Sequence, residues 1–129
     1  MAEFNTIYDS SKNAVGTFRH GVAWSRNPRQ RLGEYDYGDT GLIYDNDGKC
    51  VAKFENGRVT ASDNGYIGHH HEVPFAEMSD NAVPLVSDAL VKRLQIGERV
   101  VGWCIGNPGS ACAALLFLFS KGQHARTLA

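Results

Sequence analysis

Residues Ile7–Gly21 read IYDSSKNAVGTFRHG, and residues Ile43–Gly57, thirty-six positions further along the chain, read IYDNDGKCVAKFENG. Aligned without a gap, the two stretches share Ile, Tyr, Asp, Val, Phe and Gly at matching places. Repetition at a fixed period is typical of a duplicated structural unit. The sequence therefore predicts a fold built from repeats, and the repeat by itself names no chemistry.

The repeating unit is smaller than 36 residues. A strand-like segment, a polar turn and a second strand-like segment make a β-hairpin. On each returning strand a branched apolar residue precedes a small one: Val15-Gly16, Leu32-Gly33, Val51-Ala52 and Ile67-Gly68, at intervals of 17, 19 and 16 residues. Small residues at one strand position indicate a close backbone approach at a shared axis. We therefore expect four hairpins that bury their apolar faces against one another, with Val101-Gly102 as a fifth, displaced echo.

The pattern I-Y-D, turn, G-K, V-A-x-F, x-x-G, clearest in residues 43–57, resembles the bacterial 4-fold β-flower domain. The resemblance covers about residues 4–71. It implies four β-hairpins in a pseudo-fourfold arrangement, and it implies no catalytic residue. Two features depart from the family pattern: Ser11-Lys12-Asn13 stands where the second copy has Gly48-Lys49, and the SRNPRQR loop of residues 25–31 is long.

The sequence changes character after residue 73. Residues 80–94 carry Val83, Val86, Leu90 and Leu94 at helical spacing and predict a helix. Residues 99–105 predict a strand, and Ser110 is expected to cap a second helix over residues 111–121. The predicted class is mainly β with α (α+β), as a hairpin-repeat domain (1–73), a helix–strand–helix extension packed on it (74–122) and a tail (123–129).

Composition excludes several classes of function. The formal net charge of -1 gives no overall attraction to nucleic acid or to an anionic membrane. The longest apolar run, residues 111–119, is shorter than the roughly 20 residues that a membrane-spanning helix needs, and no secretory signal is recognisable at the start. Cys50, Cys104 and Cys112 have no CxxC spacing, so we expect reduced thiols and a cytoplasmic location.

His69-His70-His71-Glu72 is the most conspicuous polar cluster. On a strand, His69 and His71 would share one face and could chelate zinc or another divalent metal. Two ligands do not complete a metal site, and the alternative is the polar end of the fourth hairpin. A metal-binding protein or metal-dependent enzyme using His69 and His71 is therefore the alternative function.

Residues Arg19–Arg31 contain four arginines with Trp24 among them and no acidic residue. Cations with an interleaved aromatic ring suit phosphate contact and base stacking. The acidic stretch of residues 34–47 that follows suggests self-complementary faces more than a nucleic-acid footprint. A solvated loop is favoured, and nucleic-acid contact through Arg19–Arg31 is a further alternative.

Three other features have a chemical and a structural interpretation. The loop Gly106–Ser110 precedes a helix and could hold an anion, although a capped turn is favoured. Cys104 and Cys112 could act as nucleophiles, although apolar surroundings favour buried thiols. The recurring pairs Tyr8-Asp9 and Tyr44-Asp45 look like acid–base groups, but their recurrence favours a role in strand ends and turns.

The helix over residues 111–119 is apolar on nearly all sides, which predicts either central burial or an interface. Its candidate contact residues are Leu115, Leu116, Phe117 and Phe119. The leading hypothesis is a small non-enzymatic bacterial domain that serves binding or assembly, with a protein partner or a homo-oligomer and without a cofactor.

Overall fold

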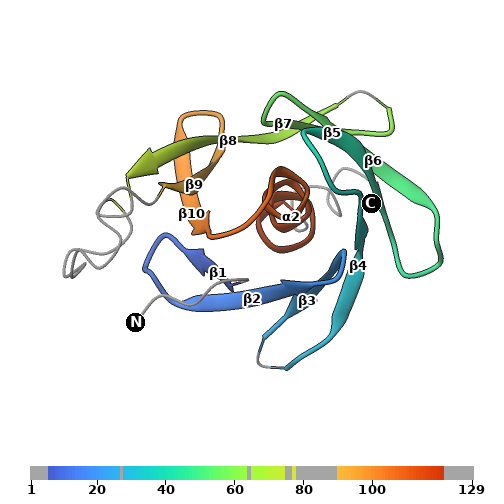
Figure 1. The fold of residues 1–129 in the computed structure, drawn as a ribbon, viewed down its shortest axis with the longest axis horizontal. Helices are drawn as coiled ribbons and strands as arrows, with labels where there is room; N and C mark the ends of the chain where they lie inside the picture. Colours follow the sequence, from blue (N-terminus) through green and yellow to red (C-terminus); the bar gives the residue numbers. More distant parts are fainter. Residues whose placement is uncertain (1–5, 27, 64, 75–76, 78–89, 121–129) are drawn as a thin grey trace.

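Ten antiparallel strands follow one another around a closed barrel, and a helix occupies its centre (Figure 1). The computed structural model describes residues 6–26, 28–63, 65–74, 77 and 90–120. The strands are β1 (Thr6–Asp9), β2 (Ala14–Arg19), β3 (Val22–Ser25), β4 (Arg31–Tyr35), β5 (Thr40–Tyr44), β6 (Cys50–Glu55), β7 (Arg58–Ala61), β8 (Tyr66–Pro74), β9 (Leu90–Ile96) and β10 (Arg99–Cys104). Each strand pairs with its neighbours in the sequence, and β1 pairs with β10, so the barrel has no free edge.

The strand pairs β1–β2, β3–β4, β5–β6 and β7–β8 lie where the sequence predicts its four hairpins. A fifth hairpin, β9–β10, stands in the same ring and contains the Val101-Gly102 echo. The fold is therefore mainly β, as expected, but a fourfold arrangement of hairpins is not confirmed. The ten-strand barrel neither confirms nor refutes the resemblance to the 4-fold β-flower domain.

The apolar–small phrase of each returning strand coincides with an irregularity of the ladder. In all five hairpins the register shifts by one residue, and the residue left without a partner is the apolar one: Val15, Leu32, Val51, Ile67 and Val101. A bulge of this kind bends the strand and increases its twist, which helps a sheet to close. All five bulge residues belong to the barrel core or pack against it.

The small residue after each bulge faces a fully buried side chain on the partner strand. The pairs are Ile7–Gly16, Ala23–Gly33, Ile43–Ala52, Val59–Gly68 and Leu94–Gly102. The first members of these pairs are between 0% and 1% exposed. These five pairs, each of one small residue and one buried residue, therefore form a ring of core contacts around the barrel.

The central element consists of α2 (Pro108–Ala114) and one π-helical turn, η2 (Leu115–Phe119). The small residues of α2 are almost completely buried, and the larger side chains of η2 reach the glycines of different hairpins. An added Cβ at Gly16, Gly33, Gly68 or Gly102 would lie 2.7, 2.6, 3.0 and 3.0 Å from Leu118, Phe117, Leu115 and Phe119, respectively. The side chains of this central helix lie against the glycines, and the predicted shared axis of four hairpins is not confirmed.

The prediction of a helix over residues 80–94 is wrong in its described part, because Leu90–Ile96 forms strand β9. Leu94 faces the barrel core, whereas Val91 packs on the outside against Val73 and Trp103. Both faces of the strand are thus covered. A spacing of four residues, as between Leu90 and Leu94, is common to one face of a helix and one face of a strand, so it did not distinguish the two. Residues 80–89 and the predicted tail lie outside the described residues.

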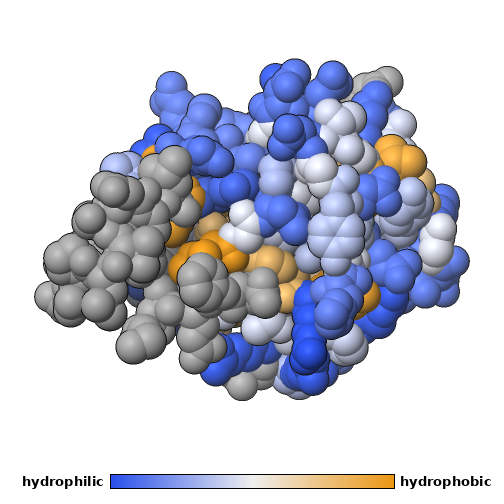
Figure 2. All heavy atoms as spheres, viewed as in Figure 1, coloured by the Kyte–Doolittle hydropathy of each residue, from blue (hydrophilic) through white to orange (hydrophobic). Residues whose placement is uncertain are grey.

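Figure 2 shows the molecule in the same view as Figure 1. Hydrophilic residues surround the visible face, and hydrophobic residues lie towards its middle. Within the part of the chain that the structure describes, no helix combines the length and the apolar character needed to cross a membrane.

Candidate functional site

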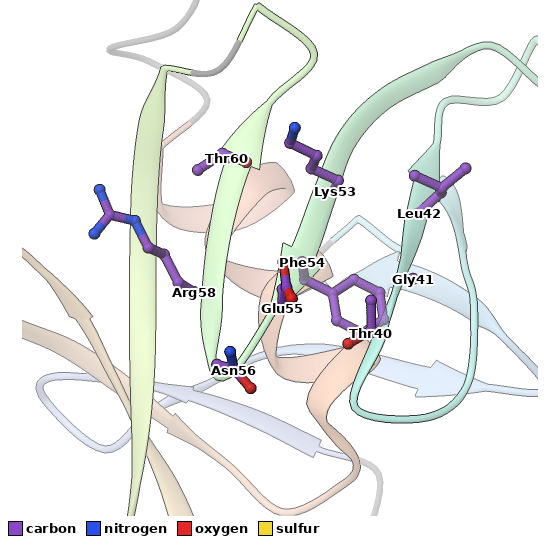
Figure 3. A pocket seen from close by; sticks show the side chains of 9 residues that line it. All are labelled: Thr40, Gly41, Leu42, Lys53, Phe54, Glu55, Asn56, Arg58 and Thr60. Atoms are coloured by element: carbon purple, nitrogen blue, oxygen red, sulfur yellow. The ribbon is translucent and has the colours of Figure 1, made fainter.

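A groove of about 710 Å³ crosses the outer face of β5, β6 and β7 (Figure 3). It is lined by Thr40, Gly41, Leu42, Lys53, Phe54, Glu55, Asn56, Arg58 and Thr60. Alternation along each strand explains most of the lining, because Ile43, Ala52 and Val59 point into the barrel and their neighbours point outwards. Gly41 and Phe54 have the inward orientation and border the groove from beneath. The groove therefore lies outside the core ring and is open to solvent.

Two cross-strand rows set the chemistry of this groove. In the first row, Lys53 pairs with Leu42 on one side and with Thr60 on the other. In the second row, Glu55 pairs with Thr40 and with Arg58. Directly opposed side chains on a sheet lie about 5 Å apart at Cβ, so charges of both signs alternate with hydroxyl and aliphatic groups across three strands.

The floor of the groove depends on a glycine. An added Cβ at Gly41 would lie 2.9 Å from Cζ of Phe54, whose ring is 1% exposed. Figure 3 shows this ring pointing towards Gly41 and Thr40. The missing side chain at Gly41 thus lets Phe54 close the base of the groove while Leu42, which is 39% exposed, stands at its side.

The sequence did not reveal this groove. Its residues come from three strands, and their separation along the chain hides the fact that they are neighbours. The groove could have been found from the outward-facing residues of each hairpin, but these residues can be identified only when the strand register is known.

His69 and His71 do share one outer face of β8, as the sequence predicts. Their ring centroids are 5.0 Å apart, and Nδ1 of His69 lies 2.6 Å from the hydroxyl of Tyr66. Burial, and next the charges of His71 and Arg58, lower the pKa of His69. Among the residues that the structure describes, no group of three His, Cys, Asp or Glu side chains is placed to hold a metal ion. The pair therefore lacks a further protein ligand in this part of the chain.

The arginines of Arg19–Arg31 are partly engaged within the chain. The guanidinium of Arg29 lies 4.4 Å from the ring centroid of Trp24, so it covers one face of the indole. Arg31 forms an ion pair of 3.0 Å with Glu34 and donates to Asn46. These contacts engage Trp24, Arg29 and Arg31 within the chain. Nucleic-acid contact through Arg19–Arg31 stays a prediction.

The loop before α2 forms a capped turn, but the capping residue is Asn107 and not Ser110. Oδ1 of Asn107 accepts a hydrogen bond of 2.8 Å from the backbone N–H of Ser110, and Pro108 follows in the first turn. Ser110 is 1% exposed and donates to the Asn107 carbonyl. The polar groups of this loop are therefore used within the loop.

The three cysteines are free thiols. Burial raises the pKa of both Cys104 and Cys112 to about 12. A thiol is nucleophilic as its thiolate, so these two residues have the properties of small core side chains.

The recurring aspartates hold turns. Oδ1 of Asp9 accepts from the backbone N–H groups of Ser11 and Asn13, and Oδ1 of Asp45 accepts from those of Asp47 and Lys49. Asx-type bonds of this kind fix the loop between two strands. The repeated Asp is thus a scaffold residue, as its recurrence indicates.

Leu115 and Leu116 are 0% and 5% exposed, and Phe117 and Phe119 are partly buried against the same core. All four belong to the barrel interior in the single chain, which agrees with the central burial that was one of the two expectations. Association through them is not tested by one chain.

Comparison of the chain with known protein families, with curated proteins and with solved structures found no match. The function therefore has to be argued from the residues themselves.

Proposed function

We propose that the chain is a non-enzymatic binding module whose outer groove on β5–β7 accepts an extended peptide segment of a protein partner. The observation that supports this best is the groove itself, with its two cross-strand rows of alternating character. The cytoplasmic location that we expect from the free thiols remains part of this proposal.

The shape of the groove favours a peptide over a small molecule. Small-molecule sites usually enclose about 70–90% of the surface of their ligand. This groove lies on an outer sheet face, while α2 and η2 fill the barrel interior in which a compact ligand would otherwise be enclosed. An extended chain can gain contact area by crossing several strands without being enclosed.

The charges favour the same class of partner. Lys53 can pair with an acidic side chain and Glu55 with a basic one, while the guanidinium of Arg58 lies over the ring of Tyr66, 4.8 Å from its centroid. Thr40 and Thr60 offer hydroxyls to a peptide backbone, and Leu42 offers exposed apolar surface. Because the barrel has no free edge, such a peptide would be held by side chains and not as an added strand.

The test is selection of peptides from a random twelve-residue phage library on the purified protein. We expect an enriched family of peptides whose affinity falls at least about tenfold on the double variant Leu42→Asp, Lys53→Glu. The matched control is Glu98→Lys, which changes an exposed residue of the β9–β10 turn, outside the groove lining. Circular dichroism would establish that all the variants are folded.

Three outcomes would overturn the proposal: no enrichment, enriched peptides that bind the groove variant equally well, or a wild-type protein that is an oligomer and that Leu42→Asp converts to a monomer. The last result would assign the groove to a second copy of the chain instead of a peptide partner.

A further inference from the structure

Next to the ring of small residues, the barrel interior has a second layer of side chains, and most of its members are aromatic. It is formed by the residue two positions after the small residue on each returning strand: Phe18, Tyr35, Phe54, His70 and Cys104. The first three are aromatic rings that are 4%, 5% and 1% exposed. Three hairpins thus fill this layer with rings, and the fourth and fifth hairpins place polar or small groups there.

The partner strands follow a matching rule. Tyr35 donates its backbone N–H to the carbonyl of Gly21, Phe54 pairs with Gly41, and His70 donates its backbone N–H to the carbonyl of Gly57. In each case a ring faces a glycine. In the fifth hairpin the large side chain is on the other strand, because the small Cys104 pairs with the long Lys92. The ring that would occupy this position is therefore missing, and an ammonium and a thiol stand in its place.

His70 is left with unmet hydrogen-bonding capacity. Both of its ring nitrogens are buried, and neither has a partner among the described residues. Neutral imidazole has one donor and one acceptor, and a buried polar group without a partner destabilises the fold. Buried polar groups are rarely left in this state, so the position calls for a partner that the described chain does not supply.

Lys92 adds a charge to the same sector. Its side chain is only 12% exposed, and its ammonium lies 3.6 Å from a carboxylate oxygen of Glu72, whose side chain is 59% exposed. The charge of Lys92 also acts on His70, Cys104 and Cys112. A largely buried ammonium with one long contact to an exposed carboxylate is poorly compensated for its loss of hydration.

We propose that His70 of β8 and Lys92 of β9 form a binding site for a small oxyanion. An imidazole N–H and an ammonium can donate to two oxygens of one phosphate or carboxylate group. The other titratable groups of this sector are Glu72, Cys104 and Cys112, while His69 and His71 lie on the outer face. The anion would take over the contact that Glu72 makes with Lys92. This site is separate from the outer groove and does not depend on it.

The first test is thermal unfolding of the protein in sodium phosphate and in sodium acetate, against sodium chloride at equal ionic strength. At an anion concentration of ten times Kd, we expect the Tm to rise by about 5 °C. His70→Phe restores the ring of the first three hairpins, and Lys92→Met removes the charge at similar chain length; both should abolish the rise. The matched control, Lys49→Met in the exposed β5–β6 turn, should keep it.

The second readout locates the anion, because the imidazole NMR signals of His70 should move on titration with the effective anion while those of His20 stay in place. A response to phosphate alone would assign the site to phosphate groups, and a response to both anions would assign it to oxyanions in general. The proposal is overturned if no anion raises the Tm above the chloride reference, or if His70→Phe and Lys92→Met respond as the wild type does.

Discussion

The ring of Phe117 occupies the space that the missing side chain of Gly33 leaves free, since an added Cβ at Gly33 would lie 2.6 Å from Cζ of Phe117. The same relationship joins η2 to the glycines of three other hairpins. Backbone and helix therefore approach closely at several points around the ring, and the tightness of these contacts makes them sensitive to a single methyl group.

Gly33→Ala should lower the free energy of unfolding by about 2 kcal/mol, because the new methyl group would overlap the backbone carbonyl oxygen of Tyr44 as well as the ring of Phe117. Urea denaturation followed by circular dichroism would measure the change. The control is Gly65→Ala, where the added Cβ would meet only the Asp63 side chain, at 3.1 Å and near the surface. Equal stability of the two variants would contradict the close packing around Gly33.

Leu116→Glu should prevent folding, since Leu116 is 5% exposed inside the barrel and a buried carboxylate there has no partner to compensate it. The control Leu42→Glu places the same charge on an exposed outer position and should leave the protein folded. Circular dichroism and light scattering distinguish the outcomes. A folded Leu116→Glu protein with a smaller mass than the wild type would instead support the interface hypothesis for this helix.

The turn aspartates should contribute measurably to stability. Asp45→Ala removes the acceptor of two backbone N–H groups, those of Asp47 and Lys49, and we expect a loss of about 1 kcal/mol. Asp47→Ala changes an exposed neighbour in the same turn and should cost less. Chemical denaturation of both variants checks the difference, and an equal loss would show that the side-chain bonds of Asp45 are not the cause.

The hairpins were predictable because their signals are local. Turn residues such as Asp45 and Gly48 follow from backbone chemistry, and the Val15-Gly16 phrase marks a bulge that every hairpin repeats. The apolar run of residues 111–119 predicted a helix that is either centrally buried or an interface, and the single chain places it at the centre of the barrel. Its position along the barrel axis, with β1 pairing to β10, depends on contacts between distant residues that periodicity does not reveal.

Strand β9 was missed because its two faces are buried for different reasons. Leu94 meets the barrel interior, and Val91 meets Val73 and Trp103 outside, so the alternation expected of a half-exposed strand is lost. The polar pair His70 and Lys92 was missed for a related reason. The sequence marks His70 as part of a histidine run. That it stands where three other hairpins have Phe18, Tyr35 and Phe54 is visible only when the strand register is known.

Thiol reactivity should separate the three cysteines. Cys104 and Cys112 are 0% exposed, whereas Cys50 is half-buried on β6. Iodoacetamide at about pH 8 should therefore alkylate Cys50 first in the folded protein, and all three should react after denaturation. Mass spectrometry of peptides provides the measurement, with Cys50→Ser as the control. Alkylation of Cys104 in the folded state as fast as that of Cys50 would contradict the buried core position.

The stability of the barrel should fall with acid because of His70. Burial, and next the charge of Lys92, lower the pKa of His70 from 6.5 to about 4. Between these two values the unfolded chain binds more protons at this position than the folded chain does, so the free energy of unfolding decreases as the pH falls from 6.5 to about 4. Allowing for the partial exposure of the residue, the loss is about 2 kcal/mol.

His70→Phe should remove this acid-dependent loss and, at neutral pH, raise the free energy of unfolding by about 1–2 kcal/mol, because it replaces two buried nitrogens without partners by ring carbons. Urea denaturation at several pH values between 7 and 4 gives both quantities. His71→Phe is the matched control, since His71 is exposed on the same strand and its replacement should leave the loss between pH 6.5 and about 4 in place. If His70→Phe destabilises the protein at neutral pH, its ring does not belong to the aromatic layer formed by Phe18, Tyr35 and Phe54.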